Sequence, residues 1–207
     1  MLLANNLSFS RNNKEIFNDL NLSISPNKIV HIAGRNGIGK TTLIKILANV
    51  LIPKTGEIYW NGKSLKKNIK EFLNNLTYIM DIQTSKNEMT VFENIFFWKK
   101  LFSSKIKYEE INILLEVLNI EKYKDTLVNK LSYGEKRKLE ISRLVIEKKK
   151  LWIFDEPYLG LDKDTINIFD ETLSNHTKNK GMIIFSSHFN LEMRGVELLD
   201  LEDYADN

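Results

Sequence analysis

The stretch "GRNGIGKTT", residues 34–42, decides the fold of this chain. It follows the apolar run "KIVHIA" and precedes "LIKILANVL", so a glycine-rich loop joins a predicted strand to a predicted helix. The pattern G-x-x-x-x-G-K-[ST] in this context indicates a phosphate-binding loop, because glycines let backbone N–H groups approach phosphate oxygens. We expect Lys40 to reach the β and γ phosphates of a nucleotide and the Thr41 hydroxyl to bind Mg²⁺. A glycine-rich turn that arose by chance is the alternative interpretation.

The composition is that of an ordinary globular protein. The chain has 207 residues, and 43% of them are hydrophobic, which is enough to build a core. Its 30 basic and 27 acidic residues give a net charge of +3, too even a balance to require a nucleic-acid partner. The absence of cysteine excludes a disulfide framework and thiolate metal sites. We therefore expect no nucleic-acid partner and no protein-built zinc centre.

The sequence gives no sign of membrane insertion. The N-terminal segment "MLLANNLSFSRNN" turns polar too early for a secretory signal, and no apolar run approaches the roughly 18 residues that a spanning helix needs. We expect a soluble or peripheral protein.

Hydrophobic spacing divides the chain into three parts. Residues 1–33 alternate apolar and polar positions, which predicts strands, and "EIYWNGKSL" predicts a hairpin closed by Asn61 and Gly62. From about 90 to 147 the spacing becomes helical, as in "VFENIFFWKKLF" and "EEINILLEVL". Strands return at "LWIFD" and "GMIIFSS" with a helical segment between them. This alternation predicts an α/β fold with a parallel sheet.

Two further strand ends carry candidate catalytic residues. "LWIFDEP", residues 151–157, ends a buried strand in Asp155 and Glu156, and the ligand crevice of a parallel sheet lies at such ends. Asp155 would hold Mg²⁺ through water and Glu156 would polarise the attacking water. "FSSHF" places His188 at the end of the next strand, where it could contact the γ-phosphate. The alternatives are acidic residues at a helix start and a satisfied polar histidine.

A second possible anion site occurs at "LSYGE", residues 131–135. A serine and a glycine precede a basic helical stretch, an arrangement that lets a helix N-terminus hold an anion. Because the loop at 34–42 already serves one set of phosphates, this second site needs another explanation.

The order of these motifs resembles the nucleotide-binding domain of ABC ATPases. The likeness rests on the phosphate loop, a helical insertion, "LSYGE", "LWIFDEP", "LGLD" and "FSSHF", and it covers nearly the whole chain. It implies a P-loop NTPase with a RecA-like core, an N-terminal antiparallel β-subdomain and an inserted helical subdomain. The whole of 1–207 would form one ATP-binding domain, with 1–80 and 148–207 as the core and about 81–147 as the helical subdomain.

The resemblance also explains the second anion site. In this family two domains pair head to tail on ATP, and each ATP lies between one phosphate loop and the partner's signature helix. Ser132 and Gly134 match the signature motif, with Tyr133 where glycine is usual and Glu135 where glutamine is usual. Asp162 in "LGLD" would lie at the dimer interface. The resemblance thus implies an ATP-hydrolysing homodimer.

Two positions depart from the family pattern. Where an adenine-stacking aromatic is usual, this chain has Arg11, whose guanidinium plane can also stack on a base, with Phe9 as the spare candidate. Where a glutamine usually bridges the Mg²⁺ site to the helical subdomain, an ungapped match places Ile82, with Gln83 one residue later. Either the loop shifts so that Gln83 points inward, or the bridge is absent; we favour Gln83, and expect Ile82 to be buried.

Three stretches narrow the resemblance. "TGEIYWNGKSL", "EMTVFENIFFW" and "LWIFDEP" are similar to the ATP-binding subunits of haem exporters in c-type cytochrome biogenesis. This implies separate transmembrane subunits, contacted near residues 81–90 and the helices after them, and a peripheral position on the cytoplasmic face of the bacterial inner membrane or on an organellar inner membrane. Another small ABC export system, a soluble ABC ATPase and a catalytically inactive binding subunit are the alternatives. We expect Trp60 and the aromatics at 96–98 to pack in cores and not to contact haem.

The predicted site residues, with Mg²⁺ as cofactor and ATP as substrate, fall into four groups. They are Glu156, His188 and Lys40 for catalysis; Arg11, Gly34, Arg35, Asn36, Gly37, Ile38, Gly39, Lys40, Thr41 and Thr42 for ATP binding; Ser132, Gly134, Glu135 and Asp162 for the partner's ATP and the dimer interface; and Thr41, Asp155 and Gln83 for the metal.

Overall fold

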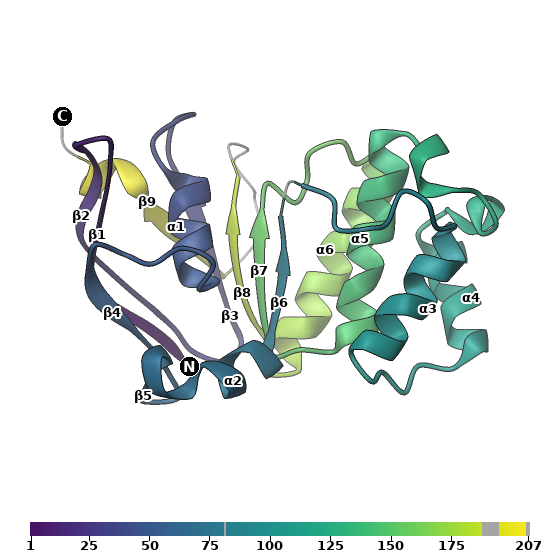
Figure 1. The fold of residues 1–207 in the computed structure, drawn as a ribbon, viewed down its shortest axis with the longest axis horizontal. Helices are drawn as coiled ribbons and strands as arrows, with labels where there is room; N and C mark the ends of the chain where they lie inside the picture. Colours follow the sequence, from purple (N-terminus) through teal and green to yellow (C-terminus); the bar gives the residue numbers. More distant parts are fainter. Residues whose placement is uncertain (81, 188–194, 206–207) are drawn as a thin grey trace. The chain divides into compact units, whose positions relative to one another are not determined.

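The computed structural model describes residues 1–80, 82–187 and 195–205. Within them the chain forms two compact units (Figure 1). Unit 1 comprises 1–80, 150–157 and the residues from 175 onward, and unit 2 comprises 81–149 and 158–174. Unit 2 therefore includes residues 158–174 as well as the predicted helical subdomain.

Unit 1 contains an antiparallel sheet in the order β2-β1-β4-β5. The predicted hairpin joins β4 to β5, and Trp60 pairs with Lys63 across a two-residue turn. Both turn residues have positive φ, 50° at Asn61 and 78° at Gly62, as a type I′ turn requires. The strands are β1 (Leu2–Arg11), β2 (Lys14–Ile24), β4 (Thr55–Trp60) and β5 (Lys63–Ser64).

The second sheet of unit 1 is parallel and has the order β6-β7-β8-β3-β9. Its edge strand β9 was not predicted, because "VELLD" is short, has a charged residue at two of its five positions and buries none of its side chains. The α/β prediction with a parallel sheet is confirmed. The strands are β3 (Lys28–Ala33), β6 (Leu76–Ile79), β7 (Leu151–Asp155), β8 (Met182–Ser186) and β9 (Val196–Asp200).

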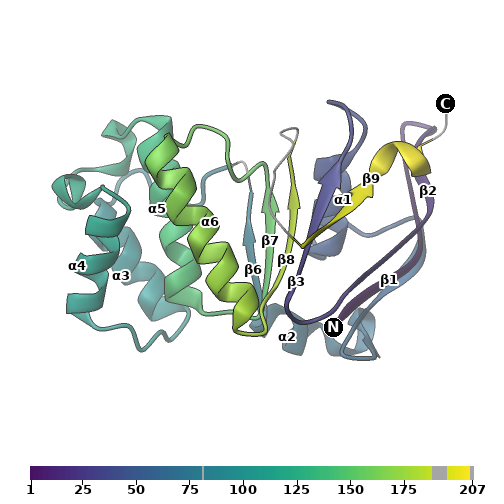
Figure 2. The ribbon, with the colours of Figure 1, turned by 180° about the vertical axis from the view of Figure 1, so that it is seen from behind.

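Helix α1 (Lys40–Leu47) lies between these two sheets in Figures 1 and 2. Its apolar side chains join one hydrophobic cluster with residues of both sheets. Helix α2 (Leu65–Asn74) contributes Phe72, whose ring meets the edge of Trp60 at 5.7 Å between centroids. Trp60 is 1% exposed, so the prediction that it packs in a core is confirmed. The burial of the α1 side chains in the same cluster fixes this helix, and the phosphate loop lies at its start.

Unit 2 is helical, as the spacing over 90–147 predicted. Helix α3 begins after Thr90, whose hydroxyl accepts from the Glu93 N–H at 3.2 Å. Helices α5 and α6 run side by side in Figures 1 and 2. The elements are α3 (Val91–Leu101), α4 (Tyr108–Val117), α5 (Tyr133–Glu147), α6 (Lys163–Lys178, ending in unit 1) and the 3₁₀ turns η1 (Glu121–Tyr123), η2 (Val128–Lys130) and, in unit 1, η3 (Leu201–Tyr204).

The aromatic run on α3 is only partly a core feature. Trp98 is 3% exposed, as expected, but Phe96 is 40% exposed. The correction follows from helical geometry, because consecutive residues point about 100° apart and cannot all face the same side.

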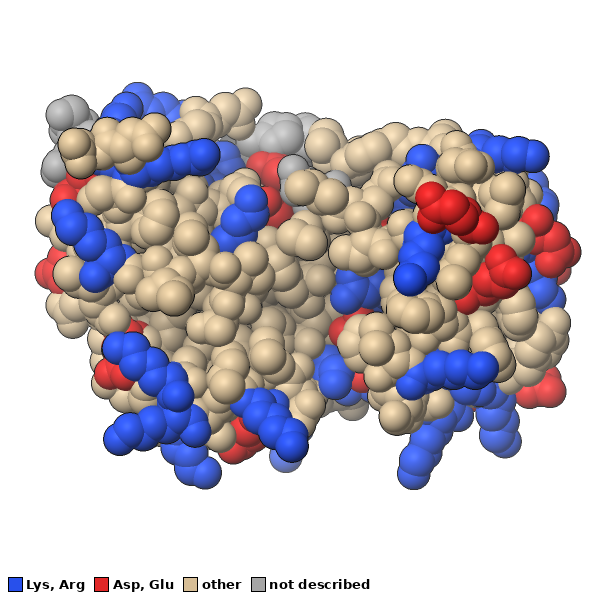
Figure 3. All heavy atoms as spheres, in the orientation of Figure 1, with Lys and Arg blue, Asp and Glu red and all other residues tan. Residues whose placement is uncertain are grey.

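Basic and acidic side chains are interspersed on the face shown in Figure 3.

Candidate functional site

The phosphate loop lies between β3 and α1 and is braced by its own lysine. The Lys40 ammonium donates to the carbonyl oxygens of Gly34 at 2.7 Å and Arg35 at 3.3 Å. Lys40 is 6% exposed, so its charge is held inside the curve of the loop by backbone dipoles. A ligand phosphate can compete for the same ammonium, which is the role predicted for Lys40.

The start of α1 leaves its backbone donors available. Gly39 is the N-cap residue, with φ of 120°, and among the described residues no side chain accepts a hydrogen bond there. Only glycine fits this position, because a Cβ would come within 2.3 Å of the Ile16 Cγ2 atom. The first N–H groups of a helix lack internal partners and carry its positive dipole end. The geometry therefore favours an anion at this point.

An oxygen cluster at the ends of β7 and β8 provides a place for a metal ion. The Thr41 hydroxyl donates to the Asp155 carboxylate at 3.1 Å, and the Ser186 hydroxyl donates to the same oxygen at 2.6 Å. Asp155 is 1% exposed. A hydroxyl and a carboxylate are hard oxygen ligands of the kind that Mg²⁺ takes, usually with waters and substrate phosphates completing its shell. These side chains thus fit the predicted cofactor.

Glu156 has an unusual backbone beside this cluster. Its φ is 47°, in the left-handed region, and its N–H donates to the Ser186 hydroxyl at 3.1 Å. Such conformations are costly for residues other than glycine and occur often at functional sites. Residue 188, the predicted histidine, lies outside the described residues.

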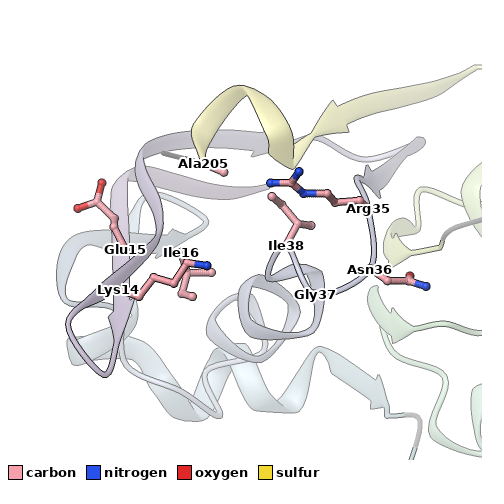
Figure 4. Close-up of a pocket in the computed structure, with 8 residues that line it drawn as sticks. All are labelled: Lys14, Glu15, Ile16, Arg35, Asn36, Gly37, Ile38 and Ala205. Carbon is pink, nitrogen blue, oxygen red and sulfur yellow. The ribbon is translucent and has the colours of Figure 1, made fainter. Parts of the chain in front are cut away.

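A cavity of about 290 Å³ adjoins the phosphate loop in unit 1 (Figure 4). Arg35 and Ile38 line it from the loop, and the Arg35 N–H donates to the Glu202 carboxylate at 3.0 Å. Figure 4 shows Asn36 pointing away from the other labelled side chains. The lining residues are Lys14, Glu15, Ile16, Arg35, Asn36, Gly37, Ile38 and Ala205. Arg11 is exposed at the end of β1 and is not among them, so its stacking on a base stays a prediction.

The signature motif forms the N-terminus of α5 in unit 2. The Ser132 hydroxyl accepts from the Glu135 N–H at 3.3 Å, while the Glu135 carboxylate accepts from the Ser132 N–H at 2.8 Å. This reciprocal capping box closes the helix start with its own side chains. Partial burial pushes the pKa of Glu135 up, but hydrogen bonds from Tyr123 and Ser132 outweigh it and leave that pKa below its ordinary value. The helix start therefore carries a stable negative charge.

The loop at 158–162 packs directly on this turn. A Cβ on Gly134 would come within 2.7 Å of the Gly160 carbonyl oxygen, and one on Gly160 would come within 2.5 Å of the Tyr133 ring. Tyr133, which stands where the family usually has glycine, therefore covers a glycine of the neighbouring loop. The two predicted dimer-interface segments are in contact within one subunit.

An ion pair fixes Asp162 to α5. The Lys138 ammonium lies 2.8 Å from the Asp162 carboxylate, and the N–H and hydroxyl of Thr165 donate to the other carboxylate oxygen. The hydrogen bond from Lys138, followed by those from Thr165, lowers the pKa of Asp162 to about 2. Sequence reasoning missed Lys138, whose position among several lysines of α5 gave no signal before the fold was known.

The loop after β6 contains Ile82 and Gln83, the two candidates for the family's bridging glutamine. Ile82 is 64% exposed, so the expectation that it is buried is wrong, because it lies in an irregular loop between β6 and α3 and not on a helix or strand face that meets a core. Gln83 is half-buried. Its role at a metal stays a prediction. Among the described residues no three histidine, cysteine, aspartate or glutamate side chains gather as a metal cluster.

Comparison with known proteins gives consistent results. The sequence profile of the family described as "ABC transporter" matches residues 17–159. The cytochrome c biogenesis ATP-binding export protein CcmA of Reclinomonas americana is 36% identical, covering 93% of this chain and 87% of that protein. The CcmA of Histophilus somni is 30% identical, covering 96% and 91%.

A solved structure shares the fold. A putative ABC transporter ATP-binding protein from Pyrococcus furiosus has a TM-score of 0.85, with 24% identity, and the alignment covers 99% of each chain. The family profile covers more than half of the chain, and the curated relatives match nearly all of it. On these matches and the phosphate loop that precedes α1, the chain belongs to the ABC transporter family, as one of its ATP-hydrolysing proteins.

Proposed function

We propose that this chain is the ATP-binding and hydrolysing subunit of a haem-export ABC transporter in c-type cytochrome biogenesis. The contact between the Thr41 hydroxyl and the Asp155 carboxylate, 3.1 Å apart beside the phosphate loop, carries the catalytic part. The names of relatives that are 30–36% identical over more than nine-tenths of this chain support the haem-export part.

The residues of unit 1 divide the work of phosphoryl transfer. Lys40 and the N–H groups at the start of α1 bind the β and γ phosphates. Thr41 and Asp155 would hold Mg²⁺, which would supply charge neutralisation at the phosphates. Gln83 is assigned to the metal as well. The Ser186 hydroxyl donates to the Asp155 carboxylate at 2.6 Å and keeps that carboxylate turned toward Thr41. Glu156 orients the attacking water, and His188 is assigned to the γ-phosphate.

A homodimer would complete each ATP site. Ser132, Gly134 and Glu135 are assigned to the partner's ATP, and Asp162 to the interface. Ser132 and Tyr133 are exposed at the start of α5, which leaves this turn accessible to a second copy. The adenine would lie toward the cavity lined by Ile16 and Ile38, where Arg11 remains the candidate for stacking.

Separate transmembrane subunits are the proposed partners. Among the described residues, none of the helices is both long and apolar enough to cross a bilayer. A surface hollow of about 300 Å³ at α3 is lined by Met89, just before the helix, and by Phe92, Glu93, Phe96, Phe97 and Lys100. We assign this hollow to the transmembrane subunit and place the chain on the cytoplasmic face of the inner membrane.

The variant Glu156→Gln tests the catalytic assignment. The carboxylate orients water while the phosphate loop binds the nucleotide, so we expect turnover to fall roughly a hundredfold or more with ATP affinity unchanged. Size-exclusion chromatography with ATP should then show a dimer, and Ser132→Arg in the same background should return it to a monomer. Wild-type turnover by Glu156→Gln would remove that residue from the mechanism.

Cells that carry Glu156→Gln as their only copy test the haem assignment. Haem staining should show that their c-type cytochromes lack covalently bound haem, and a wild-type copy of the gene should restore it. Normal cytochromes together with lost ATPase activity would instead favour the ATPase of another small export system.

A further inference from the structure

A buried carboxylate on α5 binds the loop that follows Gln83. Glu140 is 1% exposed. One of its oxygens accepts from the backbone N–H groups of Thr84 at 2.8 Å and Ser85 at 2.7 Å, and the other accepts from the Thr84 hydroxyl at 2.7 Å. Both carboxylate oxygens are therefore used to hold two consecutive residues of one loop.

Arg143 completes this cluster. Its guanidinium donates to the Thr84 hydroxyl at 3.0 Å and lies 3.4 Å from the Glu140 carboxylate. A second carboxylate, Glu147, lies 2.7 Å from the same guanidinium. The Thr84 hydroxyl thus accepts from the arginine and donates to the glutamate. Because buried charges are tolerated only when paired, moving this loop away from α5 would take three hydrogen bonds from Glu140, while Arg143 would keep its contact with Glu147.

The other end of the same loop is held by α3. Asn94 is fully buried, and its side chain accepts from the Lys86 N–H at 2.7 Å and donates to the Lys86 carbonyl at 3.0 Å. Residues 84–86 are consequently fixed on two sides, by a charged group on α5 and a neutral amide on α3. Of these two contacts, the one with Glu140 and Arg143 connects the loop to α5, the helix that begins with the signature motif.

The placement of Gln83 and Ser132 gives this contact a function. Gln83 directly precedes Thr84, and Ser132 lies eight residues before Glu140 on the same helix, about 12 Å along its axis. We propose that Glu140 is a positioning residue that couples the loop carrying Gln83 to the signature helix, so that the two move as one body when ATP binds. This inference rests on the proposed function, in which Gln83 serves the metal and Ser132 serves the partner's ATP.

Two variants loosen this contact without opening the core. Glu140→Gln keeps the shape and one acceptor oxygen but removes the charge, and Thr84→Val changes only an exposed loop residue. Glu147→Gln is the matched control, because Glu147 is also buried and pairs with Arg143, yet lies two helical turns beyond Glu140. All three are measured in the full chain, with thermal melts to report folding.

Amide hydrogen exchange and Mg²⁺ dependence are the readouts. In Glu140→Gln and Thr84→Val we expect exchange at Thr84 and Ser85 to quicken at least tenfold. The Mg²⁺ concentration for half-maximal ATPase activity should rise several-fold, with nucleotide affinity measured without Mg²⁺ unchanged. Glu147→Gln should lower the melting temperature and leave both readouts at the wild-type level.

Two results would overturn the inference. Faster exchange with wild-type Mg²⁺ dependence and turnover would show that the loop is anchored but positions nothing. Equal changes in Glu147→Gln would show that the whole cluster acts only through stability. A wild-type protein that hydrolyses no ATP would refute the proposed function instead, and would do so before any variant is compared.

Discussion

Helices α1 and α5 both begin at a predicted phosphate site, yet their N-termini are built in opposite ways. At α1 the N-cap is Gly39, no described side chain caps the helix, and the first turn, from Lys40, contains no acidic residue. At α5 the hydroxyl of Ser132 and the carboxylate of Glu135 cap each other's N–H groups. One helix start is open and positive, and the other is closed by a carboxylate of its own.

The difference in capping fits the two roles that we propose, a permanent anion site at α1 and a conditional one at α5. The first N–H groups of any helix lack internal partners. The start of α1 leaves them to a ligand, which suits tight binding of phosphate. The capping box at the start of α5 already satisfies some of these N–H groups, so this turn stays folded without a ligand. A phosphate that binds there, as we propose, must share the site with Glu135.

The largest effect is expected at the open end. Lys40→Ala removes the ammonium that faces the loop, and a hydrogen bond to a charged group contributes about 1.5–3 kcal/mol, so nucleotide affinity should fall roughly ten- to hundredfold. Isothermal titration calorimetry measures this nucleotide affinity. Lys45→Ala, on the same helix near its C-terminus, should bind like the wild type; equal losses in both variants would contradict a special role for the loop lysine.

At the closed end, packing leaves no room for a methyl group. Gly134→Ala would place a Cβ 2.7 Å from the Gly160 carbonyl oxygen, so the backbone must shift, at a cost of about 1–3 kcal/mol that alanine's helix propensity offsets only in part. Chemical denaturation should show a net loss of stability. Lys136→Ala, in the same helical turn, reports propensity alone, and an alanine at 134 that stabilised the protein would mean that the two segments are not packed together.

Glu135→Gln separates the two functions of that side chain. The amide oxygen can still accept from the Ser132 N–H, but the negative charge next to the incoming phosphate disappears. Removing a like charge in water is worth about 1 kcal/mol at 4 Å, so half-maximal dimerisation should need roughly fivefold less ATP. The lost dipole interaction should lower stability by about 0.3–1 kcal/mol.

Glu93→Gln is the control for this prediction, because Glu93 forms the same capping box with Thr90 on α3. It should lower stability by a similar amount and leave the ATP dependence of dimerisation as in the wild type. Light scattering across an ATP titration measures both variants. An unchanged titration for Glu135→Gln would mean that no phosphate approaches the start of α5.

The smallest effect concerns acid. The pKa of Asp162 is lowered from 3.8 to about 2, so as the pH falls below 4 the unfolded chain takes up the proton first. The stability from the pair with Lys138 is therefore present above pH 4 and lost as the pH falls through 2. Because Asp162 is 59% exposed, the contribution should stay below about 1 kcal/mol.

Denaturation of wild type and Asp162→Asn at a series of pH values tests this. Asparagine can still cap α6 through Thr165, so only the ion pair is lost. The two stability curves should differ at neutral pH and converge near pH 2. Parallel curves would show that the ion pair with Lys138 contributes nothing to the hold of α5 on the loop.

Much of the fold could be predicted, and so could the meeting of Thr41 with Asp155, because the signals for them are local in the sequence. The glycines of 34–39 and the Asn61-Gly62 turn impose backbone conformations that few other residues adopt. Ile82 and Phe96 were predicted incorrectly, because each is an apolar residue on a surface and periodicity alone cannot say which side of a segment meets a core.

The sequence by itself determined the phosphate loop, the strand that ends in Asp155 and Glu156, and the helical segment that contains Ser132. Only the tertiary structure decided that Glu140 holds the loop after Gln83. Local motifs act through their own backbone and need no distant partner. A buried carboxylate, in contrast, is identified by the donors that surround it, and Glu140 lies more than fifty residues from Thr84 in the sequence, a separation that only folding closes.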